Sequence, residues 1–70
     1  MISPREKQII GLVAQGHNSK EIANQLYISQ HTVDSHRQKI KRILGVKNTA
    51  GMITRSFELG ILKVMAESHQ

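Results

Sequence analysis

Helix-start signals recur along this chain, and their spacing constrains the fold more than any other feature. Ser3-Pro4-Arg5-Glu6 combines an N-cap serine, a proline at the first helical position and a glutamate three residues after the cap. Later caps are predicted at Asn18 (with Ser19 as the alternative), Ser29 and Asn48, and glycines follow the expected helix ends at positions 16, 45 and 60. The chain is therefore predicted to be all-α, with four helices at about 4–15, 19–26, 30–44 and 49–59.

Apolar residues recur at helical spacing within these segments and define the predicted core. They are Ile9, Ile10, Leu12, Val13 and Ala14 in the first helix, Ile22, Ala23 and Leu26 in the second, Val33, Ile40, Ile43 and Leu44 in the third, and Ala50, Ile53 and Phe57 in the fourth. Ile61 and Leu62 are expected to fold back onto this core. Seventy residues suffice for one small domain, placed at 1–62, and 63–70 is expected to be a C-terminal tail.

The composition favours a polyanionic partner. Ten Lys and Arg against five Asp and Glu give a net charge of +5, for which nucleic acid is a better match than an anionic membrane. One Tyr, one Phe and no Trp offer little surface for stacking single-stranded bases, so duplex DNA is preferred. The absence of Cys excludes disulfides and thiolate chemistry, and with no membrane-length apolar run it favours a cytoplasmic protein.

No residue pattern favours catalysis, a metal or a bound cofactor. Asp34, Ser35 and His36 include the residue types of a catalytic triad, but consecutive helical residues point about 100° apart and cannot form a relay. His31 and His36 are five residues apart, which does not pair them on one helix face for a metal. No glycine-rich phosphate loop is present. We expect no enzyme activity, no metal, no cofactor and no small-molecule ligand in this domain.

The segment from Asn18 to Arg37 has the proportions of a helix-turn-helix, whose second helix enters the major groove of DNA. Ala23 is small enough for the third helix to cross closely, and Val33 can anchor the crossing. The turn contains Tyr27, Ile28 and Ser29, without the glycine often found there. The third helix, at about 30–44, is the predicted recognition helix.

Half of the basic residues lie in one short span without an acid, and they are Arg37, Lys39, Lys41, Arg42 and Lys47. A helix in the major groove passes two phosphate strands, where Lys and Arg side chains neutralise phosphates. Arg37, Lys41, Arg42 and Lys47 are therefore predicted to contact the DNA backbone. The alternative is a solvated helix face.

An ordered series of residues resembles the LuxR-type (GerE/NarL/FixJ-like) DNA-binding domain over about residues 3–62. The series is Ser3-Pro4-Arg5-Glu6, Ala14-Gln15-Gly16, Ser19-Lys20-Glu21-Ile22-Ala23, Ile28-Ser29, His31-Thr32-Val33, Ser35-His36-Arg37, Ile40 and Leu44-Gly45-Val46-Lys47. The resemblance implies a four-helix domain of a bacterial transcription regulator. Such a domain is usually the C-terminal effector of a longer chain with a receiver or sensor, and it acts as a dimer through the last helix.

The resemblance also implies which residues contact DNA. It places base contacts at Asp34, Ser35 and Gln38, and further backbone contacts at Lys20, Thr32 and His36 besides Lys47. Gln38 can pair with adenine through two hydrogen bonds, and Ser35 can bond several bases. Lys20 lies near a helix start, where backbone N–H groups also favour a phosphate.

Two residues depart from the family pattern. Asp34 occupies a position where the family most often has Lys, and His17 one where Leu is usual. Asp34 can accept a hydrogen bond from cytosine N4, or it can repel the DNA backbone and weaken binding. His17 is interpreted as a tolerated loop residue.

The fourth helix has a second, milder apolar strip of Met52, Ser56 and Leu59. A homodimer interface through this strip is the hypothesis, and the alternative is that the strip packs on the first helix or is simply exposed. Two other functions compete with sequence-specific DNA binding. One is a protein-interaction module, for example one that docks on RNA polymerase, and the other is a nonspecific or membrane-surface basic domain.

Overall fold

The computed structural model describes residues 1–63, which form four helices and no strand. The helices are α1 (Pro4–Ala14), α2 (Ser19–Leu26), α3 (Gln30–Leu44) and α4 (Thr49–Glu58). The all-α class and the four helices were both predicted, and the helix ends agree to within about one residue. Of the tail predicted at 63–70, only Lys63 belongs to the described residues.

Each helix begins at the predicted cap. Ser3 and Glu6 form a reciprocal pair, in which the Ser3 Oγ accepts a hydrogen bond from the Glu6 N–H at 3.1 Å and the Glu6 Oε1 accepts one from the Ser3 N–H at 3.0 Å. Asn18 and Glu21 form the same pair for α2, at 2.8 and 2.9 Å. At the other end of α3, Gly45 has a φ of 70°, a left-handed conformation that glycine adopts without steric cost.

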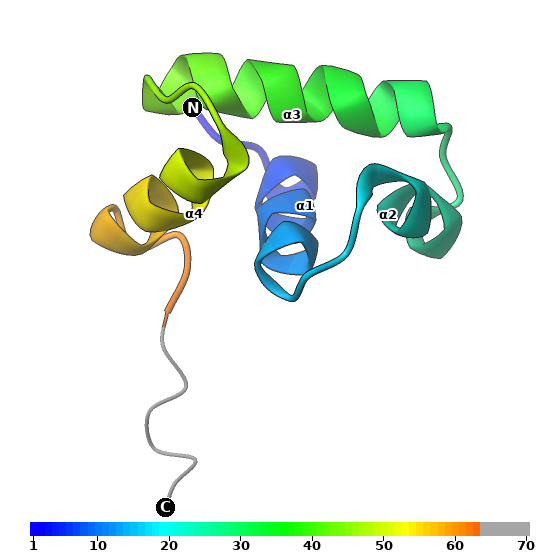
Figure 1. Cartoon of the computed structure of the whole chain (residues 1–70), viewed down its shortest axis with the longest axis horizontal. Coiled ribbons are helices and arrows are strands. Elements are labelled where there is room, and N and C mark those ends of the chain that lie inside the picture. Colours follow the sequence, from blue (N-terminus) through cyan, green and yellow to red (C-terminus); the bar gives the residue numbers. More distant parts are fainter. Residues whose placement is uncertain (64–70) are drawn as a thin grey trace, which may run out of the picture.

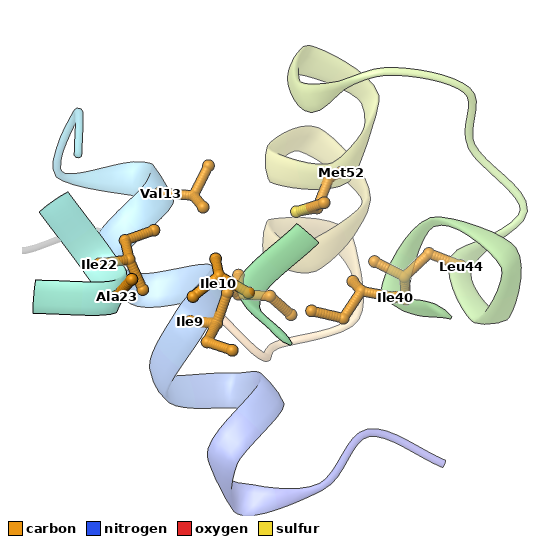
Figure 2. Packing of buried hydrophobic residues seen from close by; sticks show 9 residues of the cluster. Ile9, Ile10, Val13, Ile22, Ala23, Ile40, Leu44 and Met52 are labelled. Atoms are coloured by element: carbon orange, nitrogen blue, oxygen red, sulfur yellow. The ribbon is translucent and has the colours of Figure 1, made fainter. Parts of the chain in front are cut away.

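The long helix α3 lies across the other three helices (Figure 1). Apolar side chains from all four helices meet beneath it, and the buried ones are Ile9, Ile10, Val13, Ile22, Ala23, Val33, Ile40, Leu44 and Met52. Figure 2 shows Ile9 and Ile10 of α1 at the centre of this cluster, with Ile22 and Ala23 on one side and Ile40 on the other. The core thus fixes one face of α3 inward and leaves the opposite face in solvent.

The structure corrects the predicted orientation of α4. Ala50 and Phe57 were expected in the core, but both are exposed, Phe57 to 41%. Met52 and Ser56 were hypothesised to form a dimer strip, but both are 0% exposed, which agrees with the alternative that the strip packs on α1. At about 100° per residue the two candidate strips lie roughly 120° apart around one helix, and contact with α1 and α3 selects the Met52 side. Ile53 lies between the two strips, is half-buried and packs against the core, as predicted.

Two smaller predictions about the core were also wrong. Ile43 and Ala14 were expected inside, but both side chains are exposed. By contrast, Ile61 and Leu62 do fold back, as predicted. Their backbone N–H groups donate to the Ser56 carbonyl at 2.8 and 3.1 Å, and both side chains pack against the core.

Candidate nucleic-acid interface

The helix-turn-helix is formed by α2, α3 and the short turn between them. Ala23 and Val33 are buried in the shared core, as predicted for the crossing of the two helices. Tyr27 ends α2 with a φ of 58°, so a tyrosine adopts the left-handed conformation that glycine commonly supplies at such a turn. Its ring makes little contact with the domain, because the residue is 94% exposed.

The outer face of α3 carries the predicted base contacts. Val33, Ile40 and Leu44 are buried, whereas Asp34, Ser35 and Gln38 are all exposed. At about 100° per residue, Ser35 and Gln38 lie nearly opposite Val33. This side of α3 is therefore free of contacts with the domain core.

His31 was not among the predicted contacts, yet it lies in the same row as Ser35 and Gln38. The spacing 31, 35, 38 is the i, i+4, i+7 pattern that places side chains along one helix face, and His31 is exposed. The spacing of His31 to Ser35 and Gln38 is visible in the sequence and is the signal that could have identified it.

Asp34 lies at the edge of the outer face and borders a concave surface. Gln30, Asp34 and Arg37 line it from α3, and the turn from Gly16 to Ser19 lines the opposite side. His17, the other departure from the family pattern, also belongs to this lining. The two unusual residues therefore border the same hollow.

One flank of α3 is tied to the domain by Arg37. This half-buried side chain donates from Nη2 to the Thr49 Oγ1 at 2.9 Å and from Nη1 to the Ser19 Oγ at 3.4 Å. Ser19 and Thr49 are the first residues of α2 and α4. Although Arg37 was predicted to contact the DNA backbone, in this structure it links three helices.

The other flank is tied by Glu6, whose side chain is only 1% exposed. Its Oε2 lies 3.4 Å from the His36 Nδ1 and 3.5 Å from the Lys39 Nζ. Burial raises the pKa of Glu6, but hydrogen bonds from Ser3 and His36, together with the charge of Lys39, outweigh it and hold the pKa below its ordinary value of 4.5. This carboxyl is therefore ionised at neutral pH.

The remaining predicted backbone contacts are Lys20, Thr32, Lys41, Arg42 and Lys47. Lys41 is half-buried and the other four are exposed. The Thr32 hydroxyl lies 2.8 Å from the Ser29 Oγ. Within residues 1–63, none of the four basic side chains forms an ion pair, so their charge is available to an external anion.

Other kinds of site find little support in the described residues. No group of three or more His, Cys, Asp or Glu side chains in residues 1–63 is placed to hold a metal ion. No helix of this part of the chain has the length and apolar character needed to cross a membrane.

Comparison with known proteins agrees with this geometry. The family model of bacterial regulatory proteins of the luxR family matches residues 1–56. The transcriptional regulatory protein MctR of Rhizobium johnstonii is 41% identical over 61 residues, which are 87% of this chain and 28% of MctR. The transcriptional regulatory protein DesR of Bacillus subtilis is 45% identical over 62 residues, 89% of this chain and 31% of DesR.

A solved structure shares the fold. The crystal structure of ChrA, a response regulator in a heme-sensing two-component system, superposes with a TM-score of 0.86 at 32% identity, covering 89% of this chain and 31% of ChrA. The chain thus spans less than a third of the length of each of these proteins. The helix-turn-helix with its exposed α3 face agrees with a DNA-binding domain and not with an enzyme. The family match shows that the chain belongs to the luxR family of bacterial regulatory proteins.

Proposed function

We propose that the chain reads specific sequences of duplex DNA by placing the outer face of α3 in the major groove. The observation that supports this most directly is the division of α3 into a buried row, Val33 and Ile40, and an opposite exposed row, Ser35 and Gln38. A helix can enter the groove only with a face that its own domain leaves free.

The proposed base contacts are Asp34, Ser35 and Gln38, to which the exposed row adds His31. The proposed phosphate contacts are Lys20, Thr32, Lys41, Arg42 and Lys47. His36 and Arg37 were predicted among the phosphate contacts, but their partners Glu6 and Thr49 lie within the domain. We assign these two side chains to holding α3 in place while its outer face meets the bases.

The role of Asp34 depends on the base that faces it. If cytosine lies opposite, its N4 amino group donates to the carboxylate and Asp34→Asn loses the preference for that base. If the carboxylate only repels nearby phosphates, Asp34→Asn binds all sequences more tightly. Measuring the affinity of the wild type and of Asp34→Asn for duplexes of different sequence distinguishes these two cases.

The relatives are more than three times as long as this chain's matched region, and we propose that the domain is the output module of a longer cytoplasmic regulator.

We further propose that it acts as a homodimer through α4. Since Met52 and Ser56 are buried, the exposed strip of Ala50 and Phe57 is the surface available for that contact. Leu59 is exposed at the end of the same helix. RNA polymerase is a second proposed partner.

Selection of bound sites from random duplexes tests the proposed function. A sequence-specific dimer selects a palindromic consensus and prefers it over other DNA by about a thousandfold or more. In that setting Gln38→Ala should cost about 1 to 3 kcal/mol at one base pair, whereas Lys47→Ala should weaken all sequences alike and lower the salt slope by about one unit.

Three results would contradict parts of this proposal. A salt-dependent affinity without sequence preference would identify a nonspecific basic domain. Equal losses on all sequences from Gln38→Ala would remove it as a base contact. Sedimentation as a monomer at high concentration, both free and on the selected palindrome, would exclude the homodimer.

A further inference from the structure

Glu6 uses its two carboxylate oxygens for different purposes. Oε1 accepts the Ser3 N–H and completes the cap of α1. Oε2 is not needed for this cap, and it lies within 3.5 Å of both His36 and Lys39 on α3. A residue at the start of the chain therefore contacts one flank of the recognition helix.

This carboxylate needs a positively charged or hydrogen-bonding partner. A buried charge that is left without such a partner destabilises the folded protein. Oε2 has only His36 and Lys39 within hydrogen-bonding or ion-pairing distance among the described residues. The Lys39 side chain is 55% exposed, but its ammonium group and the His36 ring both lie next to this buried carboxylate, which favours conformations that keep them there.

The charge of the neighbouring sequence gives this contact a consequence for binding. The stretch from Arg37 to Lys47 contains five basic residues and no acid of its own. Among the described residues, Glu6 is the carboxylate that forms an ion pair with a basic side chain of this stretch. Within residues 1–63, Lys41, Arg42 and Lys47 have no such partner.

We propose that Glu6 is a positioning residue that holds Lys39 against the domain and thereby limits the positive charge that α3 presents to DNA phosphates. Limiting this charge lowers the sequence-independent part of the free energy of DNA binding. Base contacts then contribute a larger fraction of the total. The inference rests on the proposed function, because it concerns the same DNA-binding face.

A double-mutant cycle tests the proposal. The salt dependence of affinity for a short duplex of mixed sequence is measured for the wild type, Glu6→Gln, Lys39→Met and the double variant. Gln at this position retains the capping interaction but carries no charge. We expect Lys39→Met to change the salt slope by much less than one unit in the wild type and by about one unit in the Glu6→Gln background.

The second capping box provides a matched control. Glu21→Gln removes the same charge from the equivalent position of α2, where the carboxylate faces the Asn18 N–H and His17 and not α3. Lys39→Met should therefore change the salt slope by much less than one unit in the Glu21→Gln background. If Lys39→Met instead changed the salt slope equally in both backgrounds, the effect would come from the general loss of a negative charge and not from the contact with Glu6.

If Glu6→Gln does not fold, two single substitutions in the wild-type background still test the proposal. Lys47→Met should lower the salt slope by about one unit, and Lys39→Met by much less. Equal slopes for these two variants, or an additive cycle, would overturn the role of Glu6 while leaving DNA binding intact. If neither the wild type nor any variant bound duplex DNA, both the proposed function and this inference would be wrong.

Discussion

Arg37 of the recognition helix donates a 2.9 Å hydrogen bond from Nη2 to the Thr49 Oγ1, at the first residue of α4. Its Nη1 lies 3.4 Å from the Ser19 Oγ at the first residue of α2. One planar guanidinium thus joins three helices, and its fork can reach two acceptors at once.

Replacing Arg37 should therefore affect stability more than an ordinary surface substitution. We expect Arg37→Ala to lower the free energy of unfolding by about 1 kcal/mol, the typical net value of a hydrogen bond. Arg37→Lys should recover little, because one ammonium group cannot reproduce the two-pronged contact. Thermal unfolding followed by circular dichroism measures both. Wild-type stability of the lysine variant would show that the bridge adds nothing beyond charge.

Tyr27→Gly is expected to stabilise the domain. The left-handed conformation at this position costs a non-glycine residue about 1 kcal/mol, and the exposed ring contributes little packing in return. Part of the gain is offset because glycine is more flexible in the unfolded chain, so an increase of about 0.5 kcal/mol is expected. Tyr27→Ala removes the ring but retains the strained backbone. If both variants had the same denaturation midpoint, backbone strain at Tyr27 would not explain the effect.

Ser56→Ala should also raise stability. The Ser56 Oγ is buried and has no hydrogen-bond partner among the described residues. A buried, unpaired hydroxyl costs about 1 to 3 kcal/mol, and alanine fits the same space without it. Urea denaturation should show a higher midpoint with an unchanged m-value. A lower midpoint would mean that the hydroxyl forms a bond in the folded protein.

Glu6 should make stability depend on pH in the acid range. Its pKa in the folded chain lies below the ordinary 4.5, so the unfolded chain binds the proton more readily. The stabilisation is therefore complete above about pH 4.5 and is lost as the pH falls through the folded-state pKa. Melting temperatures of the wild type and Glu6→Gln should differ near neutral pH and converge on acidification. A constant difference would show that ionisation of Glu6 does not contribute.

The sequence by itself determined the helices and their ends. Capping depends on residues three positions apart, such as Ser3 with Glu6 and Asn18 with Glu21, so a short stretch contains all of the necessary chemistry. The inward positions of Val33 and Ile40 followed from helical periodicity, because both are flanked by polar neighbours, whereas Ile43 was predicted inside and is exposed. The same periodicity places His31 beside Ser35, although His31 was not among the predicted contacts.

Only the tertiary structure decided the orientation of α4 and the partners of the charged side chains. The sequence of α4 offers two apolar strips, and packing against other helices selects the one with Met52 and Ser56. Glu6 meets His36 across 30 positions, and Arg37 meets Ser19 across 18 and Thr49 across 12. Local periodicity carries no information about such contacts, since they depend on how the helices pack in space. For this reason His36 and Arg37 were read as phosphate contacts from the sequence, although the fold gives each of them a partner inside the domain.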